Sequence, residues 1–230
     1  MTTFKRAVSS CLKLGFCAAF AIALFGPREV EAKQYSYVYQ AKKVAEKLHL
    51  VVYVDDLFTP QEKLVVAQGL QEWTRATNGM ITFETKSGWT KADDMNDVTD
   101  RIGVLLGRCT KSVHIARVTP EDSLVKQIET DIDEQINGFA QGKCESKFIL
   151  LVMGRIEDDV TLAQTTTHEM GHILQLDHVP VANRTVMYPG DTKATLCVTE
   201  LDLIQLCDLE HFQCDVSKMQ PCVPVAKKHE

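Results

Sequence analysis

The chain has no hydrophobic stretch long enough to cross a membrane as a helix. Its apolar run from Leu14 to Phe25 has twelve residues, whereas a membrane-spanning helix needs about 20. Basic residues precede this run, and the segment Val30-Glu31-Ala32, with small or apolar residues at its ends, follows it. We therefore predict a cleaved signal peptide over residues 1–32, no stable membrane anchor, and a mature chain that is secreted or periplasmic.

The sequence also has no excess of positive charge. It contains 25 Lys and Arg against 31 Asp and Glu, a formal net charge of −6. Without the predicted signal peptide, 21 basic and 29 acidic residues are left, a charge of about −8. This balance gives no indication of nucleic-acid binding. Repeats, long linkers and low-complexity segments are absent, so we expect residues 33–230 to form a single domain and a monomer.

Paired Cys-x-x-Cys motifs, which would indicate a cysteine-rich zinc module, are missing as well. Two of the eight cysteines lie in the predicted signal peptide. An even number in an exported chain predicts disulfides, and four of the six cysteines fall in the last 34 residues. Six cysteines allow fifteen pairings, among which the sequence does not choose. The six are Cys109, Cys144, Cys197, Cys207, Cys214 and Cys222.

The stretch from His168 to His178 contains the candidate metal ligands and a candidate general base. His168 and His172 are four residues apart, so on a helix both imidazoles lie on one face and can reach one metal ion. Glu169 stands beside the first of them and can act as a general base toward water. If the chain turns after about Leu174, His178 can return as the third ligand. Three protein ligands leave a fourth position open, as in catalytic zinc sites.

Two other residues could supply the third ligand. Asp177 is adjacent to His178, and Glu200 lies at the start of a predicted helix. We rank His178 ahead of both. Farther along, Met187 follows His178 by nine residues, in the segment Val186-Met187-Tyr188-Pro189. From the residues alone, this methionine could simply fill the core.

Hydrophobic periodicity predicts a sequence of strands and helices. The segment Thr59-Pro60-Gln61-Glu62 is a capping box with proline at the first helical position, and it predicts a helix to about Thr77. Another helix is predicted from Glu121 to Asn137. The helix that carries the histidines should begin at Asp158 or Asp159, and a last one after Thr199. Strands are predicted at 48–54, 80–85, 101–106, 113–118 and 148–153.

These features resemble the metzincin zinc endopeptidases, in particular their matrixin branch. That family has His-Glu-x-x-His-x-x-Gly-x-x-His followed by a methionine-containing turn, the Met-turn. The resemblance implies that His168, His172 and His178 bind one catalytic Zn²⁺ and that Glu169 is the base. It also implies that Met187, with Tyr188, forms the hydrophobic floor of the site. The implied fold is α+β: a twisted mixed sheet, an active-site helix, the Met-turn and a C-terminal helix.

One residue and one segment depart from the simplest matrixin pattern. Gln175 stands where the family has glycine, and a left-handed backbone at a non-glycine residue costs on the order of 1 kcal/mol. We expect the turn to survive, because metal binding contributes far more free energy. The predicted helix at 121–137 is an additional element, and we interpret it as an insertion specific to this chain.

The sequence thus predicts a secreted zinc endopeptidase that cleaves protein or peptide substrates. The alternative is a secreted binding protein that keeps the fold with little or no turnover. The intact Glu169 and histidines argue against it, since a non-catalytic descendant has no chemical need for the base. Calcium binding by an acidic loop with Asp93, Asp94, Asp97 and Asp100 is a weaker prediction, because the spacing of a calcium loop is missing.

Overall fold

The computed structural model describes residues 47–88, 112–143, 146–182, 184–190, 195, 197–208 and 216–222. Contacts divide the chain into the units Met1–Lys42 and Lys43–Glu230, and every described residue belongs to the second. The predicted signal peptide, the strand at 101–106 and the acidic loop at 93–100 lie outside the described residues. In the part of the chain that is described, no helix is long and apolar enough to span a membrane.

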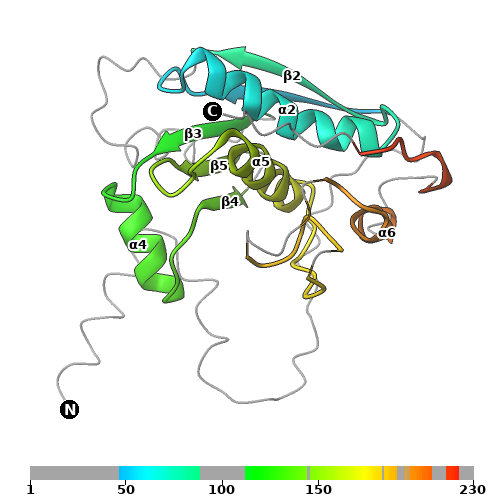
Figure 1. Cartoon of the computed structure of the whole chain (residues 1–230). Helices are drawn as coiled ribbons and strands as arrows, with labels where there is room; N and C mark the ends of the chain where they lie inside the picture. The colour runs from blue at the N-terminus through cyan, green and yellow to red at the C-terminus, as the bar shows by residue number, and fades with distance from the viewer. Residues whose placement is uncertain are drawn as a thin grey trace. The chain divides into compact units, whose positions relative to one another are not determined.

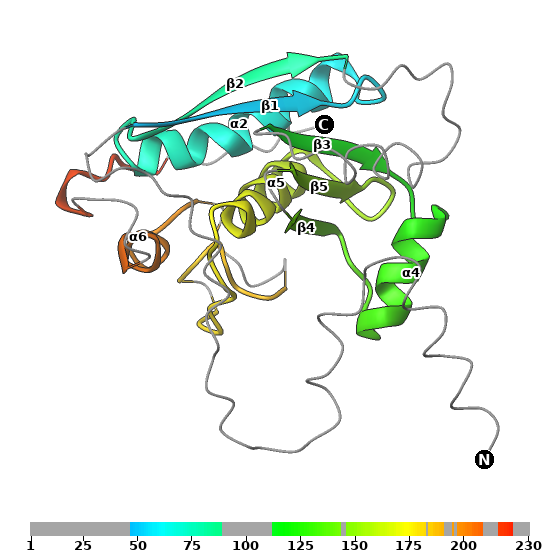
Figure 2. The same ribbon diagram turned by 180° about the vertical axis from the view of Figure 1, so that it is seen from behind.

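The described strands form one mixed sheet in the order β2-β1-β3-β5-β4. Strand β1 pairs in parallel with β2 and β3, and β3 pairs in parallel with β5. Strand β4 is antiparallel to β5 and lies at the edge (Figure 2). The strands are β1 (Leu48–Val54), β2 (Ile81–Ser87), β3 (Val113–Val118), β4 (Gly138–Lys143) and β5 (Ser146–Val152).

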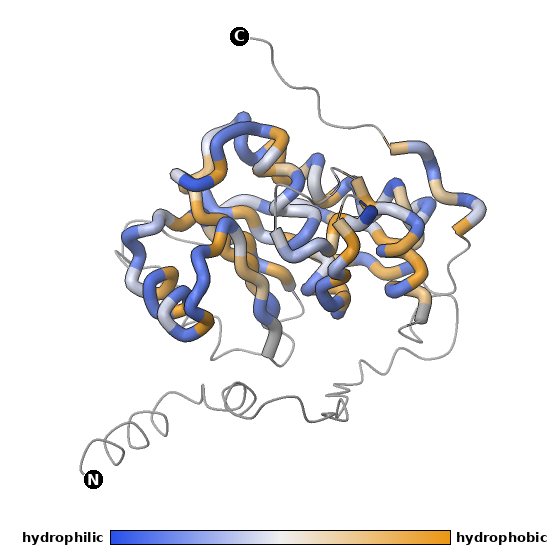
Figure 3. Tube along the Cα trace, turned by 60° about the horizontal axis from the view of Figure 1, so that its bottom comes forward, coloured by the Kyte–Doolittle hydropathy of each residue, from blue (hydrophilic) through white to orange (hydrophobic). Residues whose placement is uncertain are grey.

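The central strands β3 and β5 bury apolar side chains on both faces, because each face is covered. Ile115 and Ile149 point into the larger core cluster, which includes residues of the helices α2 (Pro60–Ala76) and α5 (Asp159–Ile173). Ala116 and Leu150 point into a smaller cluster with the helix α4 (Ser123–Ile132). This explains why β5 is a continuous apolar run and not an alternating one. Figure 3 shows hydrophobic stretches gathered within the packed body and blue and orange alternating along the helices.

The predicted helix starts are confirmed. Thr59 caps α2: its side chain accepts from the Glu62 N–H at 3.2 Å, and Glu62 accepts from the Thr59 N–H at 2.6 Å. Asp158 caps α5 and accepts from the Thr161 N–H at 2.7 Å. The closing helix α6 (Glu200–Asp208) follows Thr199 as expected. A short 3-10 turn, Val216–Lys218, comes after it.

The prediction of a helix from Glu121 to Asn137 is wrong at its end. Helix α4 stops at Ile132, because Asp133 adopts a left-handed conformation with φ of 56°. A short polar residue can take this conformation and end a helix. The chain then enters β4, a strand that the sequence analysis did not predict. Its Gly-Phe-Ala-Gln-Gly start contains no β-branched residue.

Helix α5 packs directly against α2 (Figure 1). Gly69 makes the close approach possible, since a Cβ there would lie 2.7 Å from the Ala163 carbonyl oxygen. Thr167 donates from Oγ1 to the Gly69 carbonyl at 3.0 Å, and the Trp73 indole donates to the Thr167 carbonyl at 2.9 Å. Helix α2 therefore holds α5 at the residue that precedes His168.

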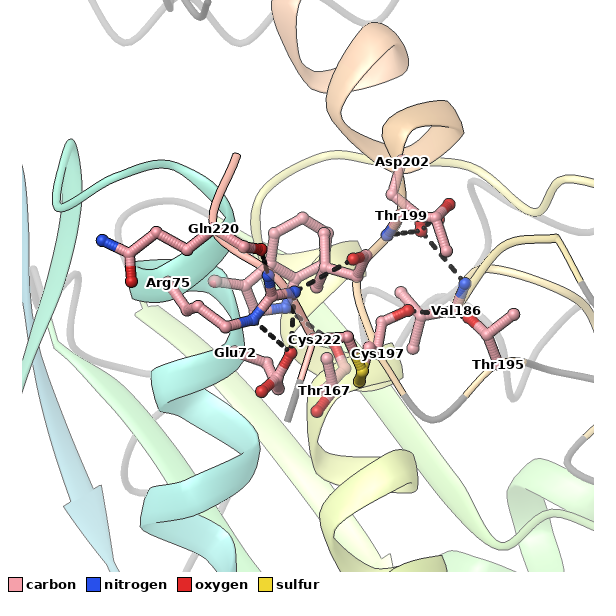
Figure 4. A network of polar contacts seen from close by, with 12 residues as sticks. Glu72, Arg75, Thr167, Val186, Thr195, Cys197, Thr199, Asp202, Gln220 and Cys222 are labelled. Carbon is pink, nitrogen blue, oxygen red and sulfur yellow. Dashed lines mark hydrogen bonds and ion pairs between the residues drawn. A yellow bond between two sulfur atoms is a disulfide. The ribbon is translucent and has the colours of Figure 1, made fainter. Parts of the chain in front are cut away.

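The C-terminal segment is tied to the body of the fold by a disulfide and an arginine (Figure 4). Cys197 and Cys222 are bonded, with their Cα atoms 5.9 Å apart, and Cys207 is also part of a disulfide. Arg75 of α2 donates to the carbonyls of Val198, at 3.1 Å, and Gln220. The expected stapling of this segment by cysteines is thus borne out for the cysteines within the described residues.

Candidate metal centre

Three imidazoles converge at the C-terminal end of α5. The Nε2 atom of His178 lies 3.2 Å from that of His168 and 3.1 Å from that of His172. One ligand atom from each histidine lies within 4.8 Å of the others. The structure therefore brings together the three residues that the sequence pattern singled out. Asp177 and Glu200, the alternative third ligands, are not part of this group.

Backbone carbonyls orient two of the rings. His168 donates from Nδ1 to the Val186 carbonyl at 2.7 Å, and His172 donates from Nδ1 to the Leu176 carbonyl at 2.9 Å. A proton on Nδ1 leaves the lone pair of Nε2 available, and this is how proteins usually fix histidines that bind a metal. The two Nε2 atoms thus face the common point as acceptors.

Burial favours the uncharged form of all three rings. Burial lowers the pKa of His168 to about 4, and it also lowers the pKa values of His172 and His178. The carboxylates of Asp177 and Glu134 act in the opposite direction on the pKa of His178. Because a metal ion competes with protons for imidazole nitrogen, neutral rings favour metal binding at pH 7.

The reversal that returns His178 to the site is a Schellman motif. The Leu176 N–H donates to the Gly171 carbonyl and the Gln175 N–H to the His172 carbonyl, both at 3.0 Å. Gln175 is left-handed, with φ of 73°. The helix-terminal carbonyl of Ile173 accepts from the Lys147 ammonium of β5 at 3.0 Å. Helix α5 therefore ends with its last carbonyls hydrogen-bonded, although the residue at the turn is not glycine.

Replacing Gln175 with glycine is expected to stabilise the protein by about 0.5–1 kcal/mol. Glycine has no Cβ and so avoids the penalty of about 1–2 kcal/mol for a left-handed backbone. The greater freedom of glycine in the unfolded chain offsets part of this gain. Urea unfolding would show the gain as a higher midpoint at unchanged slope. Gln175→Ala is the matched control, because it removes the side chain but keeps the strain. An equal gain in both variants would show that backbone strain is not the cause.

Met187 lies beneath the active-site helix. It is fully buried, and its sulfur occupies the space that a Cβ on Gly171 would need. The same Cβ would lie 3.2 Å from the Trp73 ring. Gly171 therefore lets the segment with Met187 approach α5 between the candidate ligands His168 and His172. Tyr188, next in the chain, is half-buried.

A buried carboxylate holds the Met-turn. Asp202 of α6 is inaccessible to solvent and accepts from the backbone N–H of Val186 at 3.1 Å (Figure 4). It also accepts from the Met187 N–H at 3.3 Å. It also accepts from the Thr185 hydroxyl. Since the Val186 carbonyl orients His168, Asp202 supports this candidate ligand through the backbone of the turn.

Glu169 is buried beside the first histidine and beneath the edge strand. Only 6% of its surface is exposed. A Cβ on Gly138, the first residue of β4, would lie 2.6 Å from its Oε1 atom. Glu169 is thus placed between α5 and the sheet edge, and it is not among the three converging ligand atoms.

Several residues that support the site were not predicted from the sequence. Lys147, Asp202 and Gly138 act through contacts with residues distant in the chain, and such contacts leave no local pattern. Asp202 did have a partial signal, because it stands three residues after Thr199 in a capping-box-like segment. Gly171 had none beyond its position within the His-Glu-x-x-His motif.

The donor set fits zinc. Two imidazole nitrogens on a tetrahedral Zn²⁺, each about 2.1 Å from the ion, lie about 3.4 Å apart. The observed separations of 3.1 and 3.2 Å between Nε2 atoms are close to this value. With three neutral nitrogen donors and their carbonyl partners, His168, His172 and His178 could hold the ion and leave one position open.

Comparisons with known proteins point the same way. A family model described as matrixin matches residues 54–203. Among solved structures, the chain is similar to archaemetzincin from Methanopyrus kandleri, at 14% identity and a TM-score of 0.48, over 74% of this chain and 98% of that one. No curated protein sequence gives a significant match. The structural likeness is too low to add to the assignment, which rests on the family model.

The matched residues include every strand and helix from α2 to α5 and all of the candidate site. The predicted metzincin-like α+β fold is confirmed. Membership of such a family implies a catalytic zinc and a protein or peptide substrate. Because the matrixin model matches well over half of its residues, the chain belongs to this family of metzincin-type zinc metallopeptidases.

Proposed function

We propose that the protein is a secreted zinc-dependent endopeptidase of the matrixin branch. His168, His172 and His178 hold the ion, Glu169 is the general base, and Met187 is the floor of the site. The observation that carries the proposal is the convergence of three imidazoles, two of them from α5 and one from the turn after it, beside the buried carboxylate that follows His168 on the helix. Zinc, when bound, supplies Lewis-acid polarisation of the scissile carbonyl and activates water.

The residues of the protein carry out the proton transfer, the orientation of the imidazoles and the binding of the substrate. Glu169 takes a proton from the attacking water and delivers it to the leaving amine. The carbonyls of Val186 and Leu176 keep two imidazoles oriented throughout. The outer edge of β4, which pairs only with β5 among the described strands, offers backbone hydrogen bonds to an extended peptide.

Secretion is supported by the cysteines. The Cys197–Cys222 disulfide is of a kind that forms in oxidising compartments. It fits the predicted signal peptide at residues 1–32. Calcium binding by the acidic loop at 93–100 stays a prediction.

Hydrolysis of casein by purified residues 33–230 tests the function. We expect cleavage within the chain of this unstructured substrate, loss of cleavage with a zinc chelator, and its return with added Zn²⁺. Mass spectrometry of the products distinguishes internal cleavage from trimming of the ends. Zinc bound at unit stoichiometry with no cleavage of casein or of a diverse peptide library would contradict the proposal and favour a binding protein.

A further inference from the structure

The start of the edge strand fits closely against the proposed general base. A Cβ on Gly138 would lie 2.6 Å from Oε1 and 2.7 Å from Cγ of Glu169, and 2.7 Å from Cγ2 of Thr165. Thr165 and Glu169 are one turn apart on α5, and both are buried. Only glycine allows the backbone to come this close. The position of Gly138 therefore limits where the Glu169 side chain can lie.

The residue two positions before Gly138 is held at both of its backbone groups. Ile136 donates its N–H to Oε1 of Glu129 at 3.0 Å, and its carbonyl accepts from Nη1 of Arg155 at 2.7 Å. Its side chain is buried in the smaller core cluster, together with Val125 and Ile128 of α4. Ile136 is thus fixed to helix α4 and to the loop that follows β5.

A bidentate ion pair joins those two anchors. Arg155 Nη2 donates to Glu129 Oε2 at 3.1 Å, and Nη1 donates to Oε1. The side chains are only 19% and 17% exposed, and paired guanidinium and carboxylate groups have a fixed relative geometry. One residue farther on, the Asn137 carbonyl accepts from the Val152 N–H at 2.8 Å. The path from α4 to Gly138 is therefore held by hydrogen bonds at consecutive residues.

We propose that Gly138 is a positioning residue for Glu169, and that α4, through the Glu129–Arg155 pair, fixes Gly138 in place. The inference rests on the proposed role of Glu169 as general base. This gives the segment between β3 and β4 a function. Helix α4 fixes how closely the start of the edge strand β4 approaches the Glu169 side chain. A displacement of about 1 Å in a catalytic group can reduce a rate by about 10²-fold.

The Gly138→Ala variant of the zinc-loaded protein tests the proposal. The added methyl group is expected to displace the Glu169 carboxylate and to reduce kcat by about 10²-fold. KM and zinc affinity should stay close to those of the original protein, because the three histidines are untouched. The acidic limb of the kcat–pH profile should also shift, since the base has a new environment.

Phe148→Leu is the matched control on the neighbouring strand β5. Phe148 is buried in the smaller core cluster, on the face of the sheet away from α5. This variant should lower the melting temperature while kcat and its pH profile stay unchanged. Equal losses of kcat in the two variants would show that general damage to the sheet is the cause.

Glu129→Gln provides a second, milder change in case Gly138→Ala does not fold. It keeps the shape of the side chain but weakens the pair with Arg155. We expect faster hydrogen exchange at the Ile136 amide and a several-fold lower kcat at unchanged zinc affinity. Normal kcat despite faster exchange would contradict the role given to α4.

A crystal structure of the Gly138→Ala variant separates this inference from the proposed function. A Glu169 carboxylate that stays in place, or a variant with unchanged kcat, overturns the inference. A displaced carboxylate in a protein whose original form cleaves no peptide contradicts the proposed function, and leaves the positioning of Glu169 by Gly138 established.

Discussion

Replacing Glu169 with glutamine is expected to reduce kcat for peptide cleavage by about 10²- to 10⁴-fold, the usual contribution of a general base. Glutamine has nearly the same shape as glutamate, so the buried site between α5 and β4 should keep its packing. It cannot accept the proton of the attacking water. Zinc affinity should change little, because the carboxylate is not one of the three converging ligand atoms.

Glu134→Gln is the control for this variant. Glu134 is exposed just after the end of α4, and its charge acts on the pKa of His178. Its removal takes one negative charge from the surroundings of the site without touching the proposed base. Kinetics with a fluorogenic peptide, alongside zinc titration, would compare the two variants. If Glu169→Gln kept more than about a tenth of the original kcat, another group would have to be the base.

The substitution of His178 by alanine is expected to lower zinc affinity by about 10²- to 10³-fold. Zinc sites with four protein ligands bind the ion with about 10–16 kcal/mol. One ligand therefore corresponds to about 2.5–4 kcal/mol, and each 1.4 kcal/mol is a factor of ten. His178 is also the exposed member of the triad, so its loss should disturb the core least. Competition with a chromophoric chelator would measure the change.

Asp177→Ala and Glu200→Ala are the matched controls for the third ligand. Both were alternatives on sequence grounds, and neither belongs to the converging group. They should bind zinc about as tightly as the original protein. Thermal unfolding gives an independent measure, since zinc raises the stability of a protein that binds it only when folded. Tight binding by His178→Ala, with weak binding by either control, would reassign the ligand.

Local signals explain what the sequence predicted well. The capping box at Thr59 and the polar cap at Asp158 set the starts of α2 and α5 within one residue. The spacing of His168, His172 and His178 selected residues that the fold brings together. The caps are bonded three positions along the chain, and the three histidines lie within eleven residues. Such local patterns can be recognised in the sequence without knowledge of the tertiary contacts.

Long-range contacts explain what was missed. Strand β4 has weak intrinsic preference for a strand, and its pairing with β5 forms it. Asp133 ended α4 earlier than the apolar pattern suggested. The left-handed turn at Gln175 was expected to survive, but its contact with Lys147 of β5, which donates to the Ile173 carbonyl, was not foreseen. The β4–β5 pairing and the Lys147 contact depend on residues that meet only after folding, whereas the end of α4 at Asp133 is a local backbone effect.

The compactness of the ligand set along the chain has a consequence for the order of folding. Bringing His168 and His178 together closes a loop of about 10 residues, whereas pairing Val52 of β1 with Val113 of β3 closes one of about 60. The longer closure costs about 1.6 kcal/mol more in chain entropy. Parallel pairing of distant strands is also slow. The histidine turn is therefore expected to form before β1 and β3 pair, and the sheet to assemble more slowly than the turn.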